Sequence, residues 1–269
     1  MNYKSLISNG KSVRDFKEKS IERKYLDETK AYIKESKKLI ENIDIEILDY
    51  ANVQCYEKLK SVAGYHGYMI KAPNYMLILS DVKNGYIENG GYIGEKLVLK
   101  ARDLGIDSCW VTFENSNIIK ERLDINSTKE IVAIIALGYE NNKVTKNKSS
   151  AQRMGVEKIV YVNEWNNNIS INELEERGLF DAFSYARIAP STLNRQPWRF
   201  ILDGDKVVLV VKKDDFASDY ESKIDTGIAM LYFGVIIDTT MFDLKWSLER
   251  IDKDYKIPSD YEIVGYCNI

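Results

Sequence analysis

The sequence contains little histidine, cysteine or proline. Its single histidine, His66, excludes most catalytic schemes built on a Ser/His or Cys/His pair and most histidine-based metal sites. We therefore predict no catalytic acid, base or nucleophile of that kind and no bound metal. The three cysteines, Cys55, Cys109 and Cys267, are odd in number and widely spaced, which argues against a disulfide framework and a zinc cluster. We expect three buried thiols, and a surface or packing position for His66.

The chain also has no excess of positive charge. Lys and Arg together number 38, against 41 for Asp and Glu, so the net charge is −3 and nucleic acid is not an expected partner. The longest apolar stretches, near 131–138 and 227–237, fall far short of the roughly 20 residues that a membrane-spanning helix needs. The stretch 1–15 has no apolar segment typical of a secretory signal. We expect a cytoplasmic protein that does not enter a membrane.

What the chain does have is the composition of a globular protein. Its 269 residues, 45% hydrophobic and 29% charged, could form one large domain or two closely joined halves. Helical spacing predicts helices over 19–43, 92–104 and 225–238. Short apolar runs predict strands over 75–79, 130–137, 206–211 and 261–267. The helix over 225–238 has almost no polar face, so we expect it to be enclosed on all sides.

A strand, helix and strand occur twice in the same order. The interval in sequence from Gly91 to Gly227 equals the interval from Trp110 to Trp246. A Gly-Tyr pair ends a strand in each half, at positions 138 and 265. These matches favour an α+β fold of two duplicated half-domains, 1–150 and 151–269, with antiparallel-rich sheet and flanking helices. The polar stretch 141–150 is the expected link between them.

Two segments contain the residue types of a binding site. The first, 10–16, places Lys11, Ser12 and Arg14 before a helical region, where two cations and a hydroxyl can bind one phosphate. Taken alone, such a segment also fits an ordinary surface turn. The second, 189–200, places polar side chains between two prolines, which suits the edge of a flat heterocycle. The alternative is a turn that leads into a strand through the core residues Trp198 and Phe200.

Together these segments resemble the nitroreductase family of FMN enzymes. In that family a Ser-x-Arg segment binds the FMN phosphate, and an Ala-Pro-Ser-x-x-Asn-x-Gln-Pro-Trp segment contacts the flavin ring and ribityl chain. Here they stand as 12–14 and 189–198. The resemblance extends to Lys71-Ala72-Pro73, to the stretch from Gly90 to Trp110, and to Leu137-Gly138-Tyr139, so it covers most of the chain.

The order of the motifs departs from ordinary members, in which both lie close together in a shorter chain that forms a homodimer. Here each half keeps one motif, which resembles the subgroup whose single chain folds as a fused pseudo-dimer, the TM nitroreductase type. The resemblance implies one complete site, one FMN per chain and a monomer.

The resemblance also implies roles for individual residues. Lys11, Ser12 and Arg14 would hold the phosphate and ribityl end, although Gly10 stands where many members have another Arg. Pro190, Ser191 and Asn194 would contact the flavin from the second half. The stretch Trp110-Val111-Thr112 resembles the one whose backbone lies over one ring face and donates an N–H toward N5. The remaining candidates are Tyr68, with its neighbour Tyr65, on the pyrimidine side, Arg153 near the phosphate, and Gln196 at the flavin.

Some of these assignments have alternatives. Arg153 could instead be an exposed charge, and Gln196 could brace its loop.

The function implied is an NAD(P)H-dependent oxidoreductase. NAD(P)H would reduce FMN and leave, and an electron-poor acceptor such as a nitroaromatic or quinone would then enter, in a ping-pong cycle. The cofactor supplies this chemistry, so the scarcity of histidine is no obstacle. One alternative is a flavin-binding protein of the same fold without significant turnover, and another is a scaffold that binds no flavin.

Overall fold

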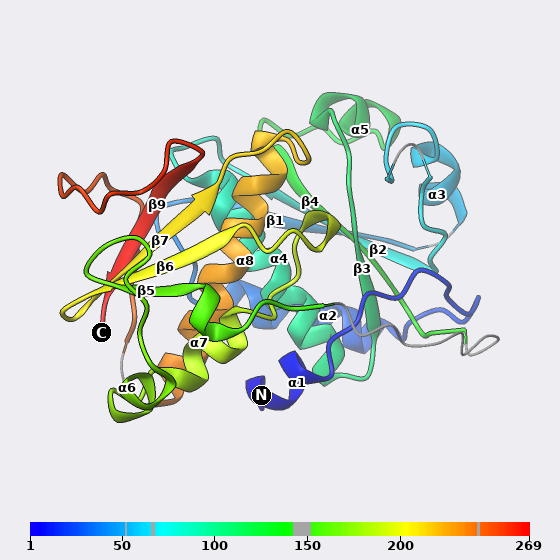
Figure 1. Ribbon diagram of the computed structural model, residues 1–269. Coiled ribbons are helices and arrows are strands. Elements are labelled where there is room, and N and C mark those ends of the chain that lie inside the picture. Colours follow the sequence, from blue (N-terminus) through cyan, green and yellow to red (C-terminus); the bar gives the residue numbers. More distant parts are fainter. Residues whose placement is uncertain (52, 66–67, 142–151, 241–242) are drawn as a thin grey trace. The chain divides into compact units, whose positions relative to one another are not determined.

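A computed structural model describes residues 1–51, 53–65, 68–141, 152–240 and 243–269 (Figure 1). The predicted linker therefore lies almost wholly outside the described residues, as does His66. The chain divides into two compact units. The first unit contains Met1 and Asn9–Ser149, and the second contains Asn2–Ser8 and Ser150–Ile269. The predicted division at residue 150, with its assignment of flavin roles to each half, stays a prediction.

The first unit is a four-stranded antiparallel sheet with helices. Its elements are α2 (Arg23–Glu35), β1 (Ile45–Ala51), α3 (Val53–Leu59), β2 (Asn74–Ser80), α4 (Tyr86–Asp103), β3 (Asp107–Val111), α5 (Ser116–Arg122) and β4 (Glu130–Gly138). The strand order is β1-β2-β4-β3, so β3 is an edge strand. α4 packs against β2, β3 and β4, and α2 packs against α4. Every residue of β2 is buried, which explains its unbroken apolar run.

The second unit has a five-stranded sheet in the order β5-β6-β7-β9-β8, with β5 parallel to β6 and the other neighbours antiparallel. Its elements are α1 (Tyr3–Ser8), β5 (Val160–Val162), α6 (Ile171–Glu176), α7 (Phe180–Ala186), β6 (Trp198–Asp203), β7 (Lys206–Lys212), α8 (Asp219–Ile237), β8 (Trp246–Ser247) and β9 (Tyr261–Asn268), with 3-10 turns at Val156–Lys158, Thr192–Asn194 and Asp238–Thr240.

The short N-terminal helix α1 belongs to the second unit, although the residues that follow it belong to the first. It packs against α7 and α8, and its Ile7 is buried. Lys4 forms an ion pair with Asp181 of α7. The chain therefore passes from one unit to the other after residue 8 and returns after residue 149.

Helix α8 confirms the expected enclosed helix. It begins at a capping box formed by Ser218 and Glu221, and every residue from Ile224 to Ile237 is buried. Phe233 contacts the rings of Phe200 in β6 and Trp246 in β8, with centroids 5.9 and 5.7 Å apart. The burial of every residue over these positions explains why α8 has no polar face.

The two sheets share one pattern of connections. β1-β2-β4-β3 and β6-β7-β9-β8 have the same pairing, and a register shift interrupts the second pairing in each, at Ile78/Leu79 and at Leu209/Val210. Trp110 of β3 pairs with Ile135, and Trp246 of β8 pairs with Cys267. This agreement supports duplication, which we keep as a proposal.

The same registers correct one of the predicted matches. On β4, Gly138 lies after Ile135, the partner of Trp110. On β9, Gly265 lies before Cys267, the partner of Trp246. Gly138 pairs with Asp107 of β3, but Gly265 pairs with Leu209 of β7. The two Gly-Tyr pairs therefore occupy different places in the two sheets, and their likeness is a coincidence of sequence.

The helix predicted over 19–43 is also too long. α2 ends at Glu35, and Ser36 is extended. The residues that follow are held by contacts from α4 instead, because Lys96 donates to the carbonyl of Lys37 and Asn89 accepts from the amide of Ile40. Tertiary contacts override the helical spacing of Leu39 and Ile40.

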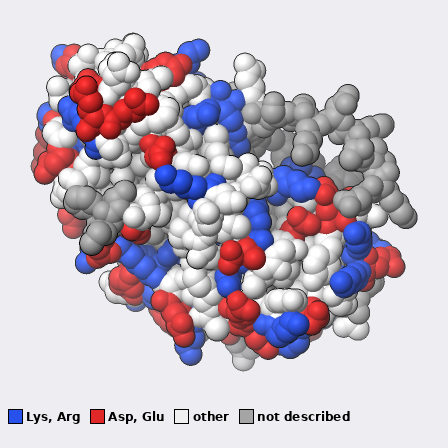
Figure 2. Space-filling view, turned by 90° about the horizontal axis from the view of Figure 1, so that it is seen from below, with Lys and Arg blue, Asp and Glu red and all other residues white. Residues whose placement is uncertain are grey.

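The charges on the surface and the state of the cysteines can be compared with the expectations from composition. Figure 2 shows basic and acidic side chains interspersed on one face of the molecule. Within the described residues, no helix is both long and apolar enough to cross a membrane. Cys55, Cys109 and Cys267 are free and buried, as predicted.

Candidate flavin site

The segment around Arg14 lies along the edge strand of the first unit. Val13 is buried, and its N–H donates to the carbonyl of Ser108 in β3 at 2.9 Å. Ser12 and Arg14 flank it and are exposed. Because alternate residues of an extended chain point to opposite sides, burying Val13 directs both neighbours outward. The segment thus presents a hydroxyl and a guanidinium on one side.

The guanidinium of Arg14 is available to a ligand. No hydrogen bond or ion pair from another described residue engages its guanidinium, whereas Lys11 forms an ion pair with Glu140. Burial raises the pKa of the Cys109 thiol, and the opposing influences are the positive charge of Arg14 and the hydroxyl of Ser12. Both side chains therefore influence the same residue of β3.

The next candidate, Trp110, is fixed by helix α4. Its indole N–H donates to the buried carboxylate of Glu95 at 2.8 Å. Its ring lies on Gly94, where an added Cβ would come within 2.4 Å of the ring. Val111 is buried and Thr112 is half-buried. Since the Ser108 carbonyl points away from β4 toward Val13, the peptide of Trp110, two positions further on, points to the same open edge.

Tyr68 stands near the end of β3. The carbonyl of Thr112 accepts from the N–H of Gly64 at 2.7 Å, and the N–H of Tyr68 donates to the carbonyl of Tyr65. Gly64 has φ +99, and a Cβ there would lie 2.3 Å from the carbonyl oxygen of Tyr68, so glycine is required. The Tyr68 side chain is 82% exposed. It has the exposure needed for ligand contact.

In the second unit, Gln196 braces the motif loop. Its side chain is buried, its Oε1 accepts from the N–H of Met154 at 2.9 Å, and its Nε2 donates to the carbonyls of Gln152 and Asn194. Its backbone N–H donates to the Ser191 hydroxyl at 3.0 Å. These bonds engage both polar atoms of the side chain, Oε1 and Nε2, so the structure favours the bracing role for Gln196.

The loop is also bent by left-handed residues. Leu193, Asn194 and Gln196 have φ of 54, 56 and 52. A non-glycine residue in this region costs about 1 kcal/mol or more, least for Asn. Surrounding contacts must therefore hold the loop in this conformation. Pro190 and Ser191 remain half-exposed, and Asn194 donates from Nδ2 to the carbonyl of Gln152 at 3.2 Å, leaving its Oδ1 for another donor.

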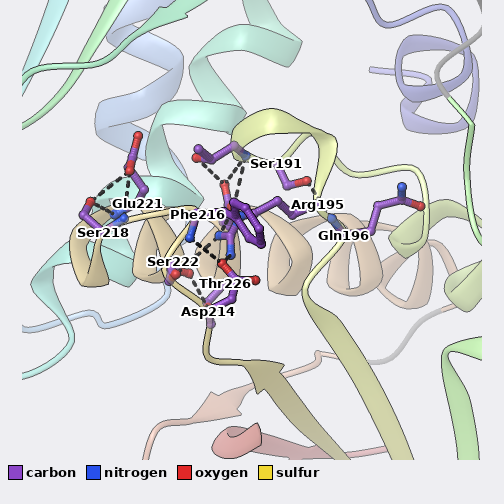
Figure 3. Close-up of polar contacts among 11 residues, drawn as sticks. Ser191, Arg195, Gln196, Asp214, Phe216, Ser218, Glu221, Ser222 and Thr226 are labelled. Atoms are coloured by element: carbon purple, nitrogen blue, oxygen red, sulfur yellow. Dashed lines mark hydrogen bonds and ion pairs between the residues drawn. The ribbon is translucent and has the colours of Figure 1, made fainter. Parts of the chain in front are cut away.

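One group of those contacts is an ionic cluster around Arg195, drawn in Figure 3. Arg195 donates to Asp214 at 2.8 Å and to Asp225 of α8 at 3.2 Å, and both its side chain and that of Asp225 are buried. Its Nη2 also lies 3.3 Å from the Ser222 hydroxyl. Asp225 accepts in addition from the N–H of Thr192 at 3.0 Å.

Burial raises the pKa of Asp225 to about 7, against the opposing influence of the Thr192 N–H and of Arg195. Sequence reasoning missed Asp225 and Arg195. The available signal was an acidic residue at the start of an otherwise apolar helical run.

Arg153 lies in the second unit and holds the same loop. Its Nη1 donates to the carbonyl of Ala189 at 2.7 Å, and the side chain is half-buried. Burial lowers the pKa of its guanidinium, with a further lowering from Arg187. Arg153 is therefore not a simple exposed charge; whether it reaches a phosphate stays a prediction.

The structure thus groups the candidates into two sets. Within the first unit the phosphate segment lies along β3, the strand that carries Trp110 and Val111, and Tyr68 lies near the end of that strand. Within the second unit Arg153 and Gln196 directly support the loop that carries Pro190, Ser191 and Asn194. Each unit also contains one long helix, α4 or α8, that occupies the same place in its sheet pattern.

Two antiparallel-rich α+β units with this connectivity and these motif loops define a nitroreductase-type fold. The chain belongs to the family described as "Putative TM nitroreductase", which it matches over residues 2–237. A comparison with curated proteins gives no match.

The chain is also similar to solved structures. A "putative nitroreductase" from Thermotoga maritima is 19% identical, with a TM-score of 0.60 over 100% of this chain and 94% of the other. An "FMN-dependent Nitroreductase" from Clostridium difficile is 20% identical, with a TM-score of 0.43 over 55% of this chain and 92% of the other. A "Putative NADH dehydrogenase/NAD(P)H nitroreductase" from Parabacteroides distasonis is 18% identical, with a TM-score of 0.46 over 58% and 97%. The first of these confirms the predicted fold class.

Proposed function

We propose that this protein is an FMN-dependent oxidoreductase that transfers hydride from NAD(P)H to an electron-poor acceptor, such as a nitroaromatic or a quinone. The observation that carries the proposal is the loop 189–198. In a chain of the nitroreductase family, this loop is rigidly braced from behind by Gln196 and Arg195 while Pro190, Ser191 and Asn194 stay accessible.

The donors of the first unit suit a phosphate. Arg14 offers a guanidinium without an internal partner among the described residues, and Ser12 offers a hydroxyl beside it. Lys11 adds a second cation, since an exposed ion pair such as that with Glu140 contributes only about 0–1 kcal/mol and can be exchanged for a ligand. Two cations and a hydroxyl match the charge of a phosphate monoester.

The groups of the second unit suit the edge of a flavin ring. Asn194 retains a side-chain acceptor, and the loop backbone near Pro190 and Ser191 adds polar groups in a fixed conformation. From the first unit, the open-edge peptide of Trp110 and the stretch to Thr112 supply the N–H predicted to point at N5. Each unit, taken by itself, thus offers polar groups of the kind that FMN requires.

Bound FMN would supply the redox chemistry, taking a hydride from NAD(P)H and passing it to the acceptor in a ping-pong cycle. The protein's residues bind and orient, and no side-chain acid or base is required of them. We propose one FMN per chain, a monomer, and a reducing compartment such as the cytosol, where the buried thiols would stay reduced.

The test begins with the visible absorbance of the purified protein, measured before and after FMN is added. NADH and NADPH consumption is then followed with a nitroaromatic and with a quinone. A yellow protein with one FMN per chain and acceptor-dependent consumption supports the proposal. Yellow protein without turnover would reduce it to flavin binding, and a colourless protein that rejects FMN would overturn it. A ratio near two FMN per chain would refute the single site.

A further inference from the structure

One helix position is used in the same way in both units. Asn89 of α4 and Asp225 of α8 are separated by the same interval in sequence as Gly91 and Gly227. Asn89 is fully buried, and its Oδ1 accepts from the N–H of Ile40 at 3.1 Å. Asp225 is 2% exposed and accepts from the N–H of Thr192 at 3.0 Å. In each unit the contacted amide belongs to the loop that leads into the first strand of the shared pattern.

The two positions differ in charge. In the first unit, Asn89 Nδ2 has no hydrogen-bond partner within the described residues. In the second unit, Asp225 also pairs with Arg195 at 3.2 Å, and Arg195 pairs in turn with Asp214. The helix residue that contacts the loop is therefore charged and ion-paired in the second unit, whose loop carries the motif predicted to contact flavin.

We propose that Asp225 is a positioning residue for the flavin-facing segment 190–194, and that it acts through Thr192 and Arg195. The inference rests on the proposed function and deepens it. Thr192 and Arg195 lie on either side of Leu193 and Asn194, the two consecutive left-handed residues. Holding both neighbours fixes the direction of the Asn194 side chain between them.

The reason for a charged anchor is the cost of this backbone conformation. Two consecutive non-glycine residues in the left-handed region are disfavoured, and Leu193 is 54% exposed, so its side chain adds little packing to offset that cost. Hydrogen bonds to an ionised group are roughly twice as strong as neutral ones. In its ionised form, which the Thr192 N–H and Arg195 favour, Asp225 supplies two such contacts from a helix that is buried in the core.

The experiment compares Asp225→Asn with Asn89→Ala, the matched change at the corresponding position of the first unit. Asp225→Asn keeps an acceptor for Thr192 but removes the charge that holds Arg195. We expect FMN to bind roughly 10-fold more weakly to this variant, with altered absorbance bands of the bound flavin. Asn89→Ala should lower the unfolding temperature while its FMN affinity and spectrum match those of the wild type.

A second variant and a readout without flavin keep the test decisive. Arg195→Met removes the other half of the pair and should produce the same spectral change. Hydrogen exchange of the amides of residues 192–196 in the flavin-free protein should accelerate in both second-unit variants and not in Asn89→Ala.

Wild-type FMN affinity and spectrum in Asp225→Asn and Arg195→Met would overturn the positioning role, even if both lost stability. If the wild type itself binds no FMN, the proposed function fails, and the exchange measurement alone decides whether Asp225 holds the loop. Unchanged exchange in both second-unit variants would then overturn the inference.

Discussion

The phosphate-binding role of Arg14 gives the sharpest quantitative prediction. Its guanidinium is exposed and makes no hydrogen bond or ion pair with another described residue, so Arg14→Ala removes no internal contact and should change the free energy of unfolding by less than about 0.5 kcal/mol. A hydrogen bond to a charged group contributes about 1.5–3 kcal/mol. Its loss should therefore raise the Kd for FMN by roughly 10- to 150-fold.

The assay is a titration of flavin-free protein with FMN, followed by quenching of flavin fluorescence and repeated at two salt concentrations. Arg122→Ala is the control, because Arg122 at the end of α5 is also exposed and lacks a partner among the described residues. It should leave the Kd unchanged. Equal Kd values for the wild type and Arg14→Ala, with both proteins folded, would show that the phosphate binds elsewhere.

Three further predictions concern stability. Burial raises the pKa of Asp225 to about 7 from the ordinary value of about 4, so between these pH values the folded state binds a proton that the unfolded state does not. The free energy of unfolding should therefore fall as pH rises from about 4 to about 7. Denaturant titrations of Asp225→Asn across that range should lack this pH dependence. Gly94→Ala places a methyl group 2.4 Å from the ring of Trp110, and calorimetry should show that the free energy of unfolding falls by about 1–3 kcal/mol. An unchanged free energy of unfolding would mean that the ring moves freely. Trp198→Ala empties a fully buried site and should cost about 3–5 kcal/mol in urea unfolding, and a cost below about 1 kcal/mol would contradict the packing described.

The parts of the fold that could be predicted from the sequence are those with one dominant local signal. β2 and β4 are continuous apolar runs because both of their faces are buried, and α8 has no polar face because it is enclosed. The helix over 19–43 was wrong at its end because Lys96 and Asn89, which belong to a later helix, determine the path of residues 37–40. Such contacts leave no trace in local spacing.

The candidate site follows the same division. The motif residues from Pro190 to Gln196 were proposed from their resemblance to a family, and their flavin contacts stay a prediction. The structure adds that Gln196 is a buried brace of the loop. The ionic anchor could not be predicted, because Asp225 is separated from Arg195 by all of β6 and β7 and reads in sequence as the first residue of an apolar helix. Only the folded chain shows that it accepts a hydrogen bond from Thr192.

Helix α1 belongs to the second unit although it precedes the first unit in sequence, and this has a practical consequence. A fragment that begins at residue 151 lacks Tyr3–Ser8, and would leave uncovered the parts of α7 and α8 on which that helix packs. A chain nicked between residues 149 and 150 keeps α1 on its amino-terminal piece, still docked on the carboxy-terminal one. If this contact persists, the two pieces elute together, and an intact elution profile does not by itself prove an intact polypeptide.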